Sequence, residues 1–209
     1  MMNVMIIVDV QNDFLPGGAL PVDNGDMIIP VINTIQPAFD LVVATQDWHP
    51  SDHQSFSSMH PGKKNFDMIS LHGLEQTLWP DHCVQGTPGA DFSDRLHMNR
   101  VEAIFRKGTN PEIDSYSGFF DNGRKKSTGL ADYLRGKKIQ QVYVSGLAAE
   151  ICVFFTAMDS LNEGFETWLI EDATMALQQE NFQRAKAEFQ QKGGKLIQSK
   201  EIAKISTTF

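Results

Sequence analysis

The sequence predicts an α/β fold, a three-layer α/β/α sandwich in which a mostly parallel sheet of about six strands lies between two layers of helices. Short, nearly continuous apolar runs recur along the 209 residues, as in strands buried on both faces of a parallel sheet. Segments with helix-like spacing of apolar residues separate most of these runs. We find no linker, repeat or low-complexity tract, so residues 1–209 are expected to form a single domain.

Six apolar runs predict the strands, and four segments with helical spacing predict the main helices. The strands, in chain order, cover residues 4–8, 41–45, 103–105, 142–145, 167–170 and 195–197. The helices cover residues 28–39, 128–135, 150–162 and 179–192. Ser127 or Thr128 would cap the second helix, and Gly136 would end it. The third helix is apolar nearly all round, which predicts that it is buried.

The segment from residue 46 to about residue 100 shows neither a helical nor a strand period over any sustained length. Loops longer than about 12–15 residues are uncommon in compact domains unless they serve a function. We therefore interpret this wall segment, residues 46–100, as the wall of an active site.

Composition and charge narrow the class of protein. Hydrophobic residues make up 41% of the chain and charged residues 21%, as in ordinary globular domains. The net charge of −8 offers no basic surface to a phosphate backbone, so nucleic acid is not expected as a partner. The first ten residues lack the basic flank of a signal peptide, and no stretch is long enough to cross a membrane. With two cysteines, Cys83 and Cys152, we expect a cytoplasmic protein with free thiols.

A metal site is indicated by the segment that follows the second apolar run. Asp47, His49 and His53 bring one carboxylate and two imidazoles together within seven residues. Such oxygen and nitrogen donors suit Zn²⁺, Mn²⁺ or Fe²⁺. By itself this pattern fits equally well a polar loop whose histidines only form hydrogen bonds.

A second group of polar residues follows three other strands. Asp9 ends the first apolar run, Lys107 follows the third, and Cys152 lies at the start of the helix after the fourth. Chemistry collects beyond the carboxyl ends of parallel strands, so the three are expected to meet. A helix N-terminus and a nearby cation lower the pKa of a thiol, and a carboxylate can take its proton. Spacing alone leaves open that Asp9 only forms a turn and that Cys152 only packs in the core.

Five segments at strand ends or in the wall segment carry a resemblance to a known family. They are Asp9-Val10-Gln11-Asn12-Asp13-Phe14, Thr45-Gln46-Asp47-Trp48-His49-Pro50 with His53-Gln54-Ser55-Phe56, residues 79–87, Phe105-Arg106-Lys107-Gly108 with Asp114-Ser115-Tyr116-Ser117, and Gly146-Leu147-Ala148 to Cys152. In this order they resemble the nicotinamidase/pyrazinamidase family of isochorismatase-like hydrolases, over nearly the whole chain. Each segment alone is weakly specific, whereas the five in order are highly specific.

The resemblance implies a catalytic role for several residues. Asp9, Lys107 and Cys152 match the family's catalytic triad. The bond between Leu147 and Ala148 matches its cis peptide between non-proline residues. The backbone N–H groups of Ala148 and Cys152 would then form the oxyanion hole.

The resemblance also implies a metal ion and a set of substrate contacts. One divalent ion, Zn²⁺ by preference and otherwise Fe²⁺ or Mn²⁺, would bind the pyridine nitrogen of the substrate and orient its ring. The residues that match the metal site are Asp47, His49, His53 and His82. Those that match the aromatic residues around the substrate ring are Phe14, Trp79 and Tyr116.

The activity implied is the conversion of nicotinamide to nicotinate and ammonia, a step of NAD salvage. Cys152 would attack the carboxamide carbon, Asp9 would protonate the departing ammonia, and water activated by Asp9 would release nicotinate. Pyrazinamide would fit the same pocket, because its ring also offers a nitrogen. A homo-oligomer remains open, and no membrane partner is expected.

Two other functions remain open at this point. Another hydrolase of the same fold, acting on other small amides or on the vinyl ether of isochorismate, would share the architecture; isochorismate hydrolases lack the D-x-H metal segment. A non-catalytic small-molecule-binding relative would keep the pocket, although the intact triad argues against it. Ala149 stands where the family often has Thr, and residues 59–78 look longer than a minimal wall loop, which leaves the selectivity open.

Overall fold

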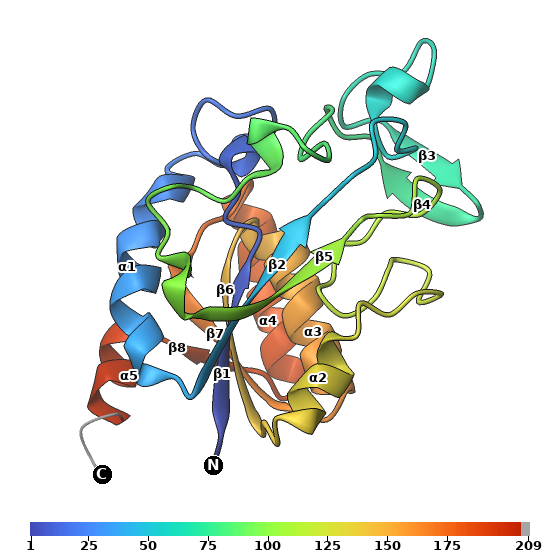
Figure 1. Cartoon of the computed structure of the whole chain (residues 1–209). Helices are drawn as coiled ribbons and strands as arrows, with labels where there is room; N and C mark the ends of the chain where they lie inside the picture. The colour runs from blue at the N-terminus through green and yellow to red at the C-terminus, as the bar shows by residue number, and fades with distance from the viewer. Residues whose placement is uncertain (206–209) are drawn as a thin grey trace.

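The computed structural model describes residues 1–205, and a six-stranded parallel sheet runs through its centre (Figure 1). The strands are β1 (Asn3–Val8), β2 (Leu41–Asp47), β5 (Val101–Lys107), β6 (Gln141–Gly146), β7 (Glu166–Thr174) and β8 (Lys195–Ile197). Their order in the sheet is β5-β2-β1-β6-β7-β8, and all neighbouring pairs are parallel. The predicted sheet is therefore confirmed, and five of its strands are one to five residues longer than the apolar runs.

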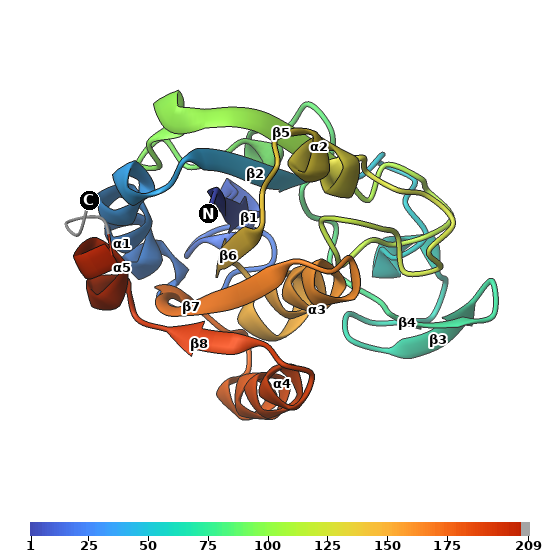
Figure 2. The same ribbon diagram turned by 90° about the horizontal axis from the view of Figure 1, so that it is seen from below.

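Helices cover both faces of this sheet (Figures 1 and 2). On one face lie α1 (Ile28–Ile35) and α5 (Ser199–Ile205), and on the other α2 (Leu130–Gly136), α3 (Phe154–Asn162) and α4 (Gln179–Gln191). The side chains of β1 alternate between the two layers: Met5 and Ile7 pack with α1, while Val4, Ile6 and Val8 pack with α2 and α3. This alternation of fully buried side chains produces the three-layer sandwich that the sequence predicts.

The register of the strands aligns their carboxyl ends. Val8, the residue before Asp9, lies opposite both Thr45 of β2 and Gly146 of β6. Asp47 lies opposite Lys107 in the pairing of β2 with β5. The polar residues that follow four different strands thus come to one edge of the sheet.

Two helix boundaries differ from the prediction. The helix predicted for residues 28–39 ends at Ile35 and continues as a 3-10 turn, because Pro37 has no N–H to donate to a preceding carbonyl. Gly129 precedes α2, and Gly136 is the last residue of the helix rather than a residue beyond it. The hydroxyl of Thr128 nevertheless accepts a hydrogen bond of 3.2 Å from the N–H of Leu130.

The predicted helix over residues 150–162 begins as a π-helical turn, Ala149–Val153, which leads into α3. The prediction that this helix is buried on all sides is wrong, because Phe155 is 43% exposed. The outer face of α3 borders a cavity instead of a packed layer. Apolar side chains on this face therefore remain accessible.

The wall segment contains one element that the sequence did not predict. Strands β3 (Met68–Leu71) and β4 (Leu74–Thr77) form an antiparallel hairpin that projects beyond the ends of β2 and β5 (Figure 1). His72 and Gly73 form its two-residue turn with positive φ angles, as in type I′ turns. The sequence did not predict this hairpin, because His is an unusual first residue of such a turn and the strands are short and only partly buried. Helix α5 was not predicted either.

None of the helices within residues 1–205 combines the length and the apolar character that crossing a membrane requires.

Candidate active site

Lys107 lies at the centre of the predicted triad. Its Nζ is 2.9 Å from Oδ2 of Asp9, 3.4 Å from Sγ of Cys152 and 3.1 Å from Oδ1 of Asp47. It also donates a hydrogen bond of 2.9 Å to the carbonyl of Ser115. All four side chains that meet here are buried. The structure thus brings the triad together and links it to the first predicted metal ligand.

The charges of this cluster depend on one another. Burial raises the pKa of Asp9, and the ammonium of Lys107 opposes the rise only in part. Burial alone would lower the pKa of Lys107, but the carboxylates of Asp47 and Asp9 raise it well above its usual value. Lys107 is therefore a permanent cation between two carboxylates. The hydroxyl of Thr45 donates a hydrogen bond of 2.6 Å to Oδ1 of Asp9 and helps to fix its orientation.

The thiol of Cys152 does not behave as predicted. It lies in the π-helical turn after β6, where burial raises its pKa well above the usual value despite the charge of Lys107. The predicted lowering of this pKa is wrong, because removal from water penalises the thiolate more than Lys107 stabilises it. A role as nucleophile would therefore require a base that takes the proton of this thiol.

The backbone beside Cys152 has the predicted cis peptide between Leu147 and Ala148. The carbonyl of Ala148 accepts the N–H groups of Ile151 and Val153 within the turn, at 3.1 and 3.2 Å. Ala148 and Cys152 line one cavity, so both are close to any substrate bound there. Their role as oxyanion donors remains a prediction.

Three of the four predicted metal ligands meet around one carboxylate oxygen. Nε2 of His49 and Nε2 of His82 lie 3.1 and 3.5 Å from Oδ2 of Asp47. Ligand atoms of these three residues all lie within 4.8 Å of one another. His53 belongs to a second such group with His49 and Asp114. Asp114 is a residue to which the sequence assigned no role, although it stands in one of the matching segments.

The imidazoles are oriented by contacts of their other ring nitrogen. Nδ1 of His49 lies 3.0 Å from the Gly108 carbonyl, Nδ1 of His53 lies 2.7 Å from Oγ of Ser55, and Nδ1 of His82 lies 2.7 Å from the carbonyl of the nearby Pro80. Such contacts leave Nε2 as the nitrogen that faces the site. These outer contacts are typical of histidines that bind metals.

The donor set fits a divalent ion. Among the described residues, the buried Nε2 of His53 has no partner, and that of His49 faces only the carboxylate of Asp47, at 3.1 Å. Burial, with the charge of His49, lowers the pKa of His53 to about 4, so its imidazole is neutral and offers a lone pair. The carboxylate of Asp47 outweighs burial and raises the pKa of His49, and a metal ion would compete with that proton for Nε2. Buried, unpaired nitrogen atoms are costly, and a cation would satisfy them.

A small inner cavity connects the predicted metal ligands with the thiol of Cys152. It is lined by Asp47 and His82 on one side, by Cys152 on the other, and by the three predicted aromatic residues. The further lining residues are Leu20, Asp114, Ala148, Ile151 and Leu177. Leu20 and Leu177 carried no signal in the sequence, because a side chain that lines a pocket looks like any core residue.

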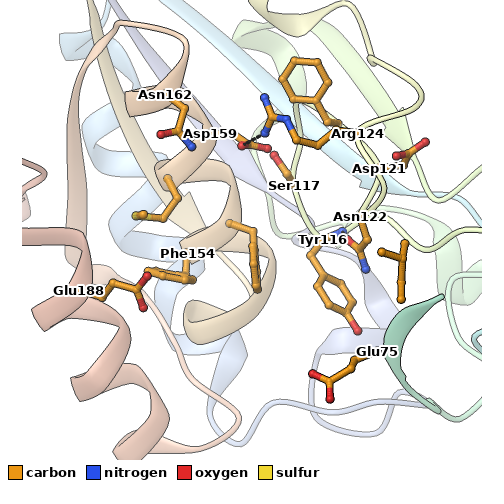
Figure 3. A pocket seen from close by; sticks show the side chains of 14 residues that line it. Glu75, Tyr116, Ser117, Asp121, Asn122, Arg124, Phe154, Asp159, Asn162 and Glu188 are labelled. Atoms are coloured by element: carbon orange, nitrogen blue, oxygen red, sulfur yellow. Dashed lines mark hydrogen bonds and ion pairs between the residues drawn. The ribbon is translucent and has the colours of Figure 1, made fainter. Parts of the chain in front are cut away.

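A larger outer cavity adjoins the inner one and shares Tyr116 with it (Figure 3). Phe154 and Phe155 of α3 line this outer cavity, and Glu75 of β4 lies across from Tyr116. The hydroxyl of Tyr116 points toward the hairpin (Figure 3). Tyr116 therefore lies between the inner and the outer cavity.

Polar side chains attach the wall segment to the sheet. The amide of Gln11 donates to the carbonyls of Asp47 and Ala90, and its oxygen accepts the N–H of Asp47, each at 2.8 Å. The carboxylate of Asp13 accepts a hydrogen bond of 2.7 Å from the N–H of Cys83. On the opposite side of the inner cavity, Glu150 accepts the N–H of Leu177 at 3.2 Å.

Comparisons with a family model and with known proteins agree on one family. The isochorismatase domain model matches residues 3–201. The nicotinamidase of Acinetobacter baylyi is 45% identical over 199 residues, which cover 95% of this chain and 93% of that protein. The nicotinamidase of Escherichia coli is 46% identical over 172 residues, or 80% of each chain.

Solved structures share the fold as well. A nicotinamidase/pyrazinamidase of Acinetobacter baumannii is 44% identical, with a TM-score of 0.93 and coverage of 96% of this chain and 97% of that one. PnC1 from L. infantum, in complex with nicotinate, is 40% identical with a TM-score of 0.84, and the match covers 95% of this chain and 93% of that one. The pyrazinamidase of Pyrococcus horikoshii, in complex with zinc, is 40% identical with a TM-score of 0.78, and the match covers 95% of this chain and 99% of that one.

Proposed function

The chain belongs to the isochorismatase family, and from that premise we propose that Cys152, Asp9 and Lys107 together hydrolyse the carboxamide of nicotinamide. The enzyme is a hydrolase of an amide C–N bond with nicotinamidase function, and pyrazinamide is a further substrate. The observation that carries the mechanism is the buried ammonium of Lys107, which contacts both Oδ2 of Asp9 and Sγ of Cys152. The reaction belongs to NAD salvage, since it returns nicotinamide to nicotinate.

In the first half of the reaction, Asp9 accepts the proton of the Cys152 thiol. The raised pKa of Asp9 suits it to that role, because burial makes its carboxylate a stronger base. The sulfur then forms a bond to the carboxamide carbon, and the backbone N–H groups of Ala148 and Cys152 donate to the oxyanion. Asp9 returns the proton to the departing nitrogen, the C–N bond breaks, and ammonia leaves a thioester on Cys152.

In the second half of the reaction, a water molecule is the nucleophile and hydrolyses the thioester. Asp9 takes a proton from the water molecule while its oxygen bonds to the thioester carbon. The C–S bond breaks, the proton on Asp9 returns to the sulfur of Cys152, and nicotinate is released. Lys107 stays protonated throughout, so its charge stabilises each anionic form of the pair.

We propose that Asp47, His49 and His82, with His53 beside them, hold one divalent ion. When bound, the ion supplies a Lewis-acid anchor for the ring nitrogen of the substrate. Zinc is the ion that we propose, with Fe²⁺ or Mn²⁺ as alternatives, and the zinc complex of the Pyrococcus relative supports it. The substrate-ring aromatics Phe14, Trp79 and Tyr116 would exclude water from the inner cavity and hold the ring in place.

Ammonia release from nicotinamide tests the mechanism with Cys152→Ala and with Cys83→Ala as its matched control. Both cysteines are buried, but only Cys152 contacts Lys107 through its sulfur among the described residues. We expect the wild type and Cys83→Ala to release ammonia and Cys152→Ala to release none above background. Ammonia release by Cys152→Ala at the wild-type rate would refute the role of Cys152 as nucleophile. A wild type that binds nicotinamide but releases no ammonia would be a non-catalytic binding protein.

A further inference from the structure

The hairpin in the wall segment directs one buried polar side chain at the metal side of the site. Gln76 of β4 is 3% exposed, whereas Glu75 beside it is exposed. The amide nitrogen of Gln76 lies 2.9 Å from Oδ2 of Asp114 and 2.7 Å from the Thr77 carbonyl. It also lies 3.4 Å from the hydroxyl of Tyr116. A surface hairpin thus contacts both a candidate metal-side carboxylate and a candidate substrate contact.

The orientation of this amide follows from its partners. The carboxylate of Asp114 and the carbonyl of Thr77 are both acceptors, so the nitrogen of Gln76, and not its oxygen, must face them. The two N–H groups of the amide then serve three acceptors, of which the Tyr116 hydroxyl, at 3.4 Å, is the most distant. A local contact with Thr77 alone would serve only the hairpin, whereas the contact with Asp114 crosses 38 positions in the sequence.

Asp114 is held from two sides. Its Oδ1 accepts the backbone N–H of Ser115 at 2.7 Å, and its Oδ2 accepts the amide of Gln76. A ligand atom of the same carboxylate lies within 4.8 Å of those of His49 and His53. The direction of this carboxylate beside the two histidines therefore depends on Gln76, because the backbone contact fixes only one of its oxygens.

We propose that Gln76 is a positioning residue that orients the carboxylate of Asp114 beside the bound metal ion and steadies the hydroxyl of Tyr116 at the inner cavity. The inference rests on the proposed function to the extent that a divalent ion binds next to His49. It gives the long wall segment a role: the hairpin supplies an outer contact to the site rather than only covering it. Outer partners of this kind hold a carboxylate in the direction that a metal site needs.

Zinc affinity, measured by competition with a chromogenic chelator, tests this role in Gln76→Met. Methionine keeps the length of the side chain and removes both N–H donors. We expect zinc to bind about 10- to 100-fold more weakly, as is usual when a partner of a metal-site residue is lost. Ser70→Ala, an exposed change on the same hairpin, should remain within about 2-fold of the wild type. Circular dichroism and the Tm establish that each variant is folded.

A double-mutant cycle separates positioning of Asp114 from a general effect on the hairpin. In an Asp114→Asn background, Gln76→Met should change zinc affinity by less than about 2-fold, because its partner carboxylate is already lost. Equal losses in both backgrounds would overturn the inference, as would wild-type zinc affinity in Gln76→Met. A wild type that binds no divalent ion would refute the metal site itself. Failure of the proposed metal site can therefore be distinguished from failure of the proposed role of Gln76.

Discussion

The two halves of the site differ in how their polar groups are satisfied. In the catalytic half, the ammonium of Lys107 contacts Asp9 at 2.9 Å and Cys152 at 3.4 Å, so each charge has a partner inside the protein. In the metal half, the buried Nε2 of His53 has no partner among residues 1–205, and that of His49 faces only the Asp47 carboxylate. The first half is complete in the protein alone, and the second presents donors that a cation would complete.

This difference shows how one sheet edge supports two kinds of chemistry. The catalytic half is preorganised by strand register, and its opposite charges face one another in a buried site. In the metal half, contacts at Nδ1 fix the orientation of the imidazoles of His49 and His53. Their Nε2 atoms stay available to a metal ion. Lys107 connects the halves, because it contacts the carboxylates of both Asp9 and Asp47.

The largest effect is expected from Lys107→Met, which removes the group common to both halves. Asp9 and Asp47 would remain buried without their cation, and breaking a buried ion pair from one side costs about 3–5 kcal/mol. Urea unfolding of the metal-free protein measures the loss, with Lys125→Met, an exposed lysine, as control. A loss below about 1 kcal/mol would show that the catalytic half does not depend on this ion pair.

Asp9→Asn should affect the catalytic half and leave the metal half intact. Loss of the general base is expected to lower kcat by about 10²- to 10⁴-fold, the usual contribution of a positioned acid–base group. Ammonia release measures kcat, and chelator competition measures zinc affinity, which should remain at the wild-type level. A similar loss of zinc affinity would mean that the two halves are not separable at Asp9.

Metal removal should act on the other half and lower stability as well as activity. A ligand that binds only the folded state at 100 times its Kd stabilises the protein by about 2.7 kcal/mol. The Tm should therefore fall on dialysis against a chelator and recover on addition of zinc, while the same treatment of His49→Ala should change little. An unchanged Tm in the wild type would contradict a cation that completes the metal half.

The smallest effect is expected where an ion pair is exposed. Arg95 contacts Asp26 at 2.8 Å, with the Arg95 side chain 59% exposed. Exposed pairs contribute about 0–1 kcal/mol, so Arg95→Ala should change the free energy of unfolding by no more than that. A loss as large as that of Lys107→Met would imply that burial is not what makes the catalytic half sensitive.

Much of this organisation could be predicted from local sequence. Apolar runs identify buried strands, and parallel strands bring their carboxyl ends to one edge, so Asp9, Lys107 and Cys152 were expected to meet before any distance was known. The hairpin was missed because its strands are short, only partly buried and joined by an unusual His-Gly turn. Gln76 was missed with it, since nothing in a polar residue of a loop marks it as buried.

The sequence by itself determined the three-layer fold, the strand-end residues and the family, because periodicity, turn residues and ordered motifs are local properties of the chain. The tertiary structure alone decided the raised pKa of Cys152, the grouping of Asp114 with His49 and His53, and the contact of Gln76 with Asp114. These properties depend on burial and charge summed over segments far apart in the sequence, and such sums exist only once the chain has folded.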